Sequence, residues 1–170
     1  LHLIRQDGWD ADRVDDLLNR ESGLRGLSGR TNDLREIQAR AADGDEKCRR
    51  AIQVFSHRAR KYIGAYAAAM GGVDAIVFTA GIGQNSALMR HRIGQRLGFL
   101  GARIDEDANR DASVDDDRPV ADISTASSRC KLLVVATNEQ RAIAEKTAKL
   151  AGGQDKPADV LTTIPIAVSA

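Results

Sequence analysis

Two glycines, Gly81 and Gly83, stand between an apolar run and a sequence of helical spacing, in the stretch VDAIVFTAGIGQNSALMRHRI at 73–93. The apolar run AIVF is partly β-branched, which predicts a strand covered on both faces and therefore central in a sheet. Asn85 or Ser86 can then cap the following helix. Ligands of open α/β sheets bind beside the carboxyl ends of the strands, where glycines let a ligand lie against the backbone. A tight turn that needs positive φ is the alternative explanation for so short a motif.

Two further polar stretches have residues that could contribute to the same site, TNDLRE at 31–36 and ATNEQ at 136–140. The second follows another buried-type strand, KLLVVAT at 131–137. If this strand and the first one are parallel neighbours, their carboxyl ends converge on one edge of the sheet. Glu139 at that edge offers the hard oxygen that Mg²⁺ prefers. A glutamate at a helix start is also explained as a favourable partner of the helix dipole.

In the first of these stretches, Asp33 and Arg35 stand two residues apart at the start of a predicted helix. Both side chains could hydrogen-bond to, or stack on, a ribose and its base. Without further information, the residues themselves favour a simpler explanation, with Asp33 as a helix-start acid and Arg35 in a surface ion pair. His57 and His91 fall inside predicted helices without a carboxylate or cysteine at ligand spacing, so neither is a candidate for catalysis.

The remaining sequence predicts alternating helices and short strands. The strongest helical pattern runs from Glu46 to Met70 and ends at two glycines. Shorter helices are predicted after the cap Asp10, after a cap at Thr31 or Asn32, over 86–97 and over 138–151. Short strands are predicted at GARID (101–105) and ADIST (121–125), around an acidic segment that we expect to be a solvated loop. The pattern indicates an α/β fold with a central sheet flanked by helices.

Composition narrows the class of protein further. The chain has 170 residues, of which 42% are hydrophobic and 29% charged, as expected of a globular domain with a substantial core. Twenty-five basic and 24 acidic residues give a net charge of +1, so we expect no nucleic-acid or membrane partner. The sequence has no signal-peptide layout and no apolar run of about 20 residues, which predicts a cytoplasmic protein. Cys48 and Cys130 lack metal-ligand spacing and are expected to be reduced and structural.

Four segments identify a family resemblance: SGRTNDLRE, RARKYIGAYAAAMGGVDAIVFTAGIGQNS, RLGFLGARID and VVATNEQRAIAEKT. In this order and at these intervals they resemble the C-terminal part of the acetate kinases, over residues 1–150. That family belongs to the actin, Hsp70 and sugar kinase superfamily. The resemblance therefore implies a partial ribonuclease H-like α/β domain, incomplete at its N-terminal side, with 151–170 as a tail. It also implies ATP-dependent phosphoryl transfer to acetate, giving acetyl phosphate and ADP, with Mg²⁺.

The resemblance also implies roles for individual residues. It places Asp33, Leu34 and Arg35 beside the adenosine. The residues that it places along the nucleotide site are Gly81, Ile82, Gly83, Gln84 and Asn85. It assigns Glu139 to the magnesium site. The catalytic residues are expected upstream of Leu1, so the chain alone is expected to have almost no catalytic activity. A homodimer is implied as well, with the helix over 46–70 as a candidate contact.

Two positions depart from the family pattern. Gln84 and Gln140 stand where the family usually has acidic residues. Three functions stay open at this point: the nucleotide-binding part of an acetate kinase, a non-catalytic remnant that binds nucleotide or forms a dimer, and a purely structural α/β domain.

Overall fold

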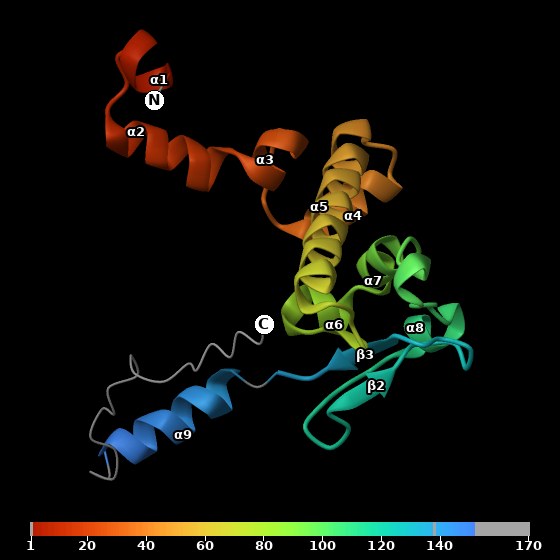
Figure 1. Cartoon of the computed structure of the whole chain (residues 1–170). Coiled ribbons are helices and arrows are strands. Elements are labelled where there is room, and N and C mark those ends of the chain that lie inside the picture. Colours follow the sequence, from red (N-terminus) through yellow and green to blue (C-terminus); the bar gives the residue numbers. More distant parts are fainter. Residues whose placement is uncertain (1, 138, 152–170) are drawn as a thin grey trace, which may run out of the picture. The chain divides into compact units, whose positions relative to one another are not determined.

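The computed structural model describes residues 2–137 and 139–151 (Figure 1). The chain divides into two compact units, residues 1–136 and 137–170, which are described separately. In the first unit the helices are α1 (His2–Gln6), α2 (Ala11–Asp16), a π-helical turn (Leu17–Glu21), α3 (Gly23–Ser28), α4 (Leu34–Ala42), α5 (Glu46–Met70), α6 (Ala80–Asn85), α7 (Ala87–Gly94), a 3₁₀ turn (Gly98–Leu100) and α8 (Glu106–Asp111). Its strands are β1 (Ala75–Phe78), β2 (Val120–Asp122) and β3 (Lys131–Val135).

Helix α5 has the bounds that the sequence predicts. Asp45 caps it by accepting hydrogen bonds from the backbone N–H groups of Lys47 and Cys48. Gly71 ends it in the left-handed conformation, with φ of 75°. The cap Asp10 of α2 is confirmed in the same way, since its carboxylate accepts from the N–H of Arg13 at 2.7 Å.

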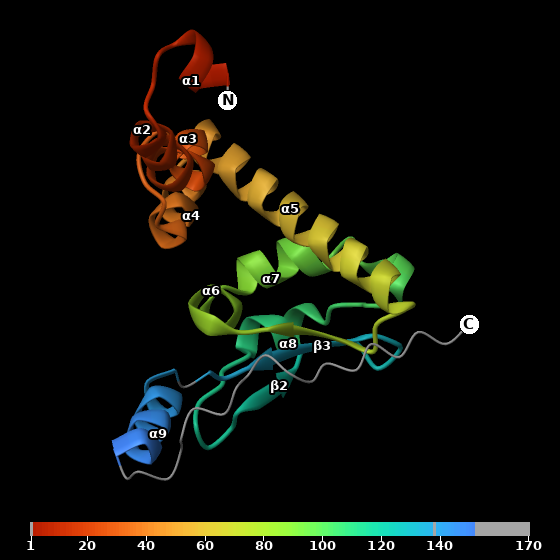
Figure 2. The same cartoon turned by 60° about the vertical axis from the view of Figure 1, so that its left-hand side comes forward.

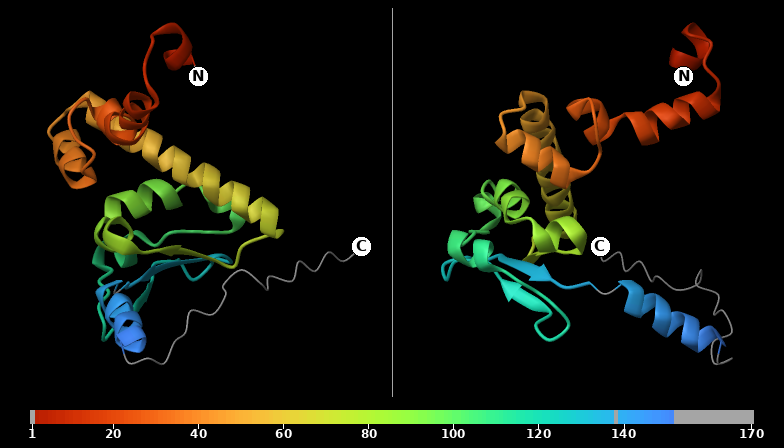
Figure 3. Two further views of the ribbon diagram at one scale, coloured as in Figure 1. Left: turned by 90° about the vertical axis from the view of Figure 1, so that its left-hand side faces the viewer. Right: turned by 180° about the vertical axis from the view of Figure 1, so that it is seen from behind.

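Helices α4 and α5 pack side by side around a small core (Figure 3). The buried residues of this core come from three helices: Leu34, Ile37 and Ala41 of α4, Cys48, Ala51 and Ile52 of α5, and Met89 of α7. The first turn of α4 is therefore fixed by Leu34, which is almost fully buried. Burial of such a side chain stabilises the fold by roughly 1.5–3 kcal/mol.

Over the described residues, the sheet has three strands in the order β1-β3-β2. Strands β1 and β3 are parallel, with Ile76 beside Leu132 and Phe78 beside Val134, and β2 pairs antiparallel to β3. The expected parallel neighbours are confirmed. The expected central place of β1 is wrong: in the described part of the chain β3 is central and β1 is an edge strand.

One face of the sheet is covered by α5 and α7 (Figure 2). Side chains of the two strands alternate, and the buried set Ile76, Phe78, Leu132 and Val134 packs with Ile93 and Leu97. The opposite face of β1 is exposed, as Val77 shows with 51% of its surface accessible. The prediction of a strand covered on both faces is therefore wrong for the described residues, because the apolar run AIVF does not reveal how many sides are covered.

Two other predictions need correction. GARID forms isolated bridges only, Ala102 with Cys130 and Ile104 with Ser124, instead of a strand. The acidic segment after it contains helix α8, capped by Asp105, and it buries Asn109. An aspartate cap followed by an acidic first turn is a helix-start signal, and it outweighs the high charge of the segment.

Cys48 and Cys130 are both free and buried, as expected, and burial raises the pKa of each thiol. None of the helices within 2–137 and 139–151 is long and apolar enough to cross a bilayer.

The second unit contains helix α9 (Glu139–Ala151), in agreement with the helix predicted over 138–151. The predicted tail at 151–170 lies outside the described residues from 152 onward.

Candidate functional site

A cavity of about 700 Å³ lies between the start of α4 and helix α6. Its walls come from two segments some fifty residues apart: Asn32, Asp33, Leu34, Arg35 and Gln38 on one side, and Gly81, Ile82, Asn85 and Ser86 on the other. Cavities of roughly 300–1,000 Å³ are typical of small-molecule sites. The fold therefore brings together the two polar stretches that the sequence singles out, 31–36 and 79–86.

Asp33 is the residue that begins α4. Its Oδ1 accepts from the backbone N–H of Arg35 at 2.9 Å, so Asp33 is the cap of α4. The prediction of a cap at Thr31 or Asn32 is wrong by one or two residues. The same carboxylate accepts from Arg35 Nε at 3.1 Å and from Arg35 Nη2 at 2.7 Å. These bonds lower the pKa of Asp33 to about 2.

The fork to Asp33 orients the guanidinium of Arg35, whose side chain is 90% exposed. An exposed ion pair of this kind contributes little to folding stability. The ion pair matters more for the orientation of Arg35 than for stability. A planar guanidinium held at its edge leaves both of its faces available for stacking on an aromatic ring.

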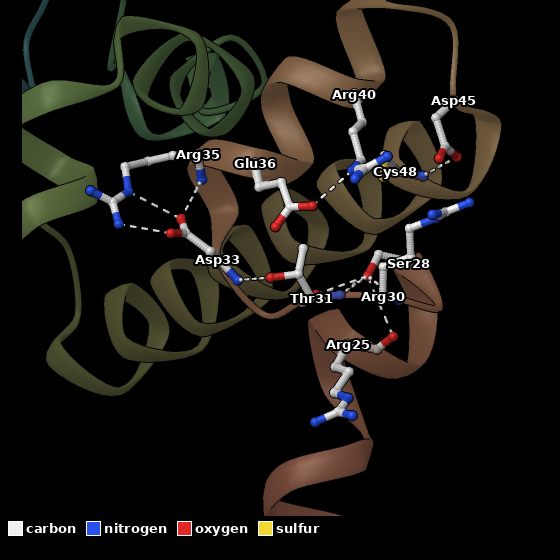
Figure 4. A network of polar contacts seen from close by, with 10 residues as sticks. All are labelled: Arg25, Ser28, Arg30, Thr31, Asp33, Arg35, Glu36, Arg40, Asp45 and Cys48. Carbon is white, nitrogen blue, oxygen red and sulfur yellow. Dashed lines mark hydrogen bonds and ion pairs between the residues drawn. The ribbon is translucent and has the colours of Figure 1, made fainter.

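The loop that leads into α4 is held by the buried hydroxyl of Ser28 (Figure 4). Ser28 Oγ donates to the carbonyl of Thr31 at 2.8 Å and accepts from the N–H of Thr31 at 3.2 Å. Thr31 Oγ1 in turn accepts from the N–H of Asp33 at 3.1 Å. This chain of bonds fixes the position from which Asp33 and Arg35 extend into the cavity.

On the other wall, the chain leaves β1 through a sharp turn. Thr79 Oγ1 donates to the carbonyl of Val135 at 3.0 Å, which ties the carboxyl ends of β1 and β3 together. Ala80 follows with φ of 56°, a left-handed conformation that costs a residue with a Cβ roughly 1–2 kcal/mol. Positive φ was expected, as the alternative, at Gly81 or Gly83, but neither adopts it.

The two glycines of α6 serve different purposes. A Cβ at Gly81 would meet nothing within 4 Å, and Gly81 lines the cavity, as expected of a residue that admits a ligand to the backbone. Gly83 is buried, and a Cβ there would lie 2.8 Å from the carbonyl carbon of Phe78 and 3.2 Å from its Cα. The missing side chain of Gly83 therefore allows α6 to pack on β1. This differs from the expected opening for a ligand, and Gly83 is not among the residues that line the cavity.

Ser86 and Gln38 join the two walls. Ser86 Oγ caps α7 by accepting from the N–H of Met89 at 3.2 Å, so of the two predicted caps Ser86 is confirmed. Ser86 Oγ also donates to Gln38 Oε1 at 2.6 Å, and Gln38 Nε2 donates to the carbonyl of Leu34 at 3.1 Å. Asn85 instead donates from Nδ2 to the carbonyl of Gly81 at 2.9 Å, within α6.

The other predicted site residues lie elsewhere or outside the described side chains. Gln84 is not among the lining residues, and its carbonyl accepts from Arg90 Nη1 at 2.7 Å. Glu139 begins α9, and its side chain lies outside the described residues. Among the described side chains, no group of three or more His, Cys, Asp or Glu is arranged to hold a metal ion. His91, which was excluded from catalysis, has its Nδ1 2.6 Å from Glu106 Oε1 on the surface.

Sequence reasoning missed four residues of this region as site residues: Asn32, Gln38, Ser86, which was predicted only as a helix cap, and Arg90. Gln38 lies four residues after Leu34, so it shares the face of α4 that carries the cavity. Arg90 lies three residues before Ile93 and seven before Leu97, in phase with the apolar stripe of the helix. A charged residue in a buried stripe is a signal that the sequence does contain.

The residues that line the cavity favour an uncharged group, or the uncharged portion of a larger ligand. Its lining charges are Asp33 and Arg35, which neutralise one another. The exposed side chain of Ile82 offers apolar surface, while Asn32 and Asn85 offer amides with both donors and acceptors. Such a lining suits a flat heterocycle and the hydroxyl groups of a sugar better than it suits a free phosphate.

Two solved kinase structures share the fold of this chain. Porphyromonas gingivalis acetate kinase matches 88% of this chain with a TM-score of 0.77 and 36% identity, and a propionate kinase from Francisella tularensis matches 85% with a TM-score of 0.74 and 36% identity. The chain covers 36% and 35% of those two chains. The fold is therefore that of part of an acetate or propionate kinase, which confirms the expected class of α/β domain.

Sequence comparison leads to the same family. The acetate kinase of Halothermothrix orenii is 45% identical over 148 residues, which are 87% of this chain and 36% of that protein. The sequence model described as the acetokinase family matches residues 1–145. The chain belongs to the acetokinase family, and it spans just over a third of the length of the curated relatives it matches.

Proposed function

We propose that this chain supplies the nucleotide-binding part of an acetate kinase, which transfers a phosphoryl group from ATP to acetate and gives acetyl phosphate and ADP. In this proposal residues 1–150 form the nucleotide-binding part and 151–170 a tail. The single observation that carries it is the cavity between α4 and α6, because it joins two segments that the family resemblance assigns independently to the nucleotide.

The adenosine would occupy this cavity. Arg35, oriented by Asp33, would stack on the base, with Ile82 as the apolar contact and the largely buried Leu34 in the wall beside it. Asn85 and the open backbone at Gly81 would contact the sugar or the base edge. The phosphates would extend beyond the cavity, because its two lining charges already compensate one another.

The family resemblance carries three further parts of the proposal. Glu139 would supply an oxygen for the Mg²⁺ that accompanies ATP. The ion would neutralise charge on the phosphates. A homodimer with α5 as a contact, and a cytoplasmic location, likewise stay predictions from the sequence.

Calorimetric titration of the 170-residue chain with ADP tests the nucleotide site. We expect saturable binding to one site, and we expect Arg35→Ala to weaken it about tenfold, from a lost stacking contribution of about 0.5–2 kcal/mol. Arg40→Ala is the matched control, because Arg40 forms an exposed ion pair with Glu36 on the same helix without lining the cavity. No heat at millimolar ADP, or an equal loss in both variants, would contradict the proposed site.

Activity requires a separate test. The chain would replace the corresponding segment of the Halothermothrix orenii acetate kinase, and acetyl phosphate would be trapped as the hydroxamate. We expect product from acetate and ATP. A folded chimera that binds ADP and forms no acetyl phosphate would favour the non-catalytic nucleotide-binding module.

A further inference from the structure

Among the residues that the structure describes, Arg90 in α7 is the largest fully buried side chain, with 2% of its surface accessible. Arginine is almost never buried to this degree unless it is well partnered, because its charge loses the solvation of water. Desolvation lowers the pKa of its guanidinium here. A side chain retained in such a place must be held by other interactions.

Four hydrogen bonds hold Arg90, and each ends on an uncharged oxygen. Nε donates to Asn109 Oδ1 at 2.8 Å, and Nη2 donates to the carbonyl of Asn109 at 2.6 Å. Nη1 donates to the carbonyls of Gly83 at 2.9 Å and Gln84 at 2.7 Å. Asn109, 3% accessible, is itself anchored through its Nδ2, which donates to the carbonyl of Ala87 at 3.0 Å. The guanidinium thus joins α6, α7 and α8.

Helix α6 needs such an external support. It has six residues, two of which are glycines, so it is too short and too flexible to be stable by itself. Its last carbonyls lack partners within the helix, and Arg90 satisfies those of Gly83 and Gln84. The residues of α6 that line the cavity, Gly81, Ile82 and Asn85, belong to this same short helix.

We propose that Arg90 is a positioning residue for the nucleotide cavity: it holds the last turn of α6, and thereby fixes the wall formed by Gly81, Ile82 and Asn85. Arg90 does not line the cavity and acts through α6 alone. Asn109 is its support, since it orients the guanidinium through both its side chain and its carbonyl. This inference rests on the proposed nucleotide site.

The choice of arginine follows from geometry. The planar fork of a guanidinium reaches carbonyls of α6 and acceptors of α8 in fixed directions at the same time, which a lysine ammonium on a flexible stem cannot do. A well-packed apolar side chain of similar volume would avoid the desolvation cost, but it would leave the carbonyls of Gly83 and Gln84 without this partner.

The test compares Arg90→Lys with Arg92→Lys, the same change at an exposed position of the same helix. Affinity for ADP is measured by calorimetry, and amide hydrogen exchange is followed in α6 and in α4. For Arg90→Lys we expect at least tenfold weaker binding and at least tenfold faster exchange in α6, with exchange in α4 unchanged. For Arg92→Lys we expect no change in either quantity.

Two results would overturn the proposal. One is an Arg90→Lys protein with the affinity and α6 exchange of the unmodified chain. The other is faster exchange that is equal in α4 and α6, since general destabilisation would then explain any loss of affinity. If Arg90→Lys does not fold, Asn109→Ala must show faster exchange in α6 than in α4, and equal exchange overturns the proposal.

Failure of the nucleotide site itself is distinguishable. If the unmodified chain binds no ADP, the proposed function fails and Arg90 has no ligand wall to position. The exchange comparison still decides in that case whether Arg90 holds α6.

Discussion

Substitution of the two glycines of α6 by alanine separates packing from ligand binding. A Cβ at Gly83 would lie 2.8 Å from the carbonyl carbon of Phe78, a backbone atom that cannot move without shifting β1. Overpacking of this kind costs about 1–3 kcal/mol. At about 2–4 °C per kcal/mol for a chain of this size, Gly83→Ala should lower Tm by roughly 2–12 °C.

Gly81→Ala is the matched control, in the same helix and with nothing within 4 Å of the added Cβ. We expect its Tm to equal or slightly exceed that of the unmodified chain, because alanine is the better helix former. Its affinity for ADP should fall, because the methyl group would project where the nucleotide approaches the backbone. Differential scanning calorimetry and ADP titration measure the two effects. A Gly83→Ala protein as stable as the unmodified chain would refute the packing argument.

Three further predictions concern single side chains. Asn109→Ala removes the acceptor for Arg90 Nε and should cost about 1–3 kcal/mol in urea unfolding, whereas the exposed Asn19→Ala should cost far less; equal costs would contradict the buried network. Ser86→Ala should cost about 1 kcal/mol in the same assay, and Ser86→Thr much less, because threonine keeps the cap of α7; an equal loss would argue against the cap. The pKa of Asp33 is lowered to about 2, so its ion pair contributes fully to folding stability above the unfolded pKa near 4, and this contribution is lost as the pH falls through 2. An NMR titration that gives Asp33 a normal pKa would show that its fork to the guanidinium is absent.

The elements beside the site were predictable because their signals are local. The 46–70 helix carries its own cap and its own terminating glycine, and the parallel pairing of β1 and β3 follows from two apolar runs with helices after them. The meeting of 31–36 with 79–86 depended on the family resemblance, since no local pattern relates segments some fifty residues apart.

The errors have physical causes as well. The edge position of β1 depends on which strands pair beside it, and an apolar run does not report that. The left-handed residue of the β1–α6 turn is Ala80, where a glycine would be expected, so the sequence directs attention to the wrong positions. Arg90 was missed because charged residues are assumed to face solvent, although its helical phase placed it in the buried stripe.

A crystal structure of the 170-residue chain with ADP tests the central claim most directly. The account predicts adenine between the first turn of α4 and α6, stacked on Arg35 and in contact with Ile82, with the phosphates outside the cavity. An adenine ring bound elsewhere on the chain, or an empty cavity at saturating ADP, would contradict it.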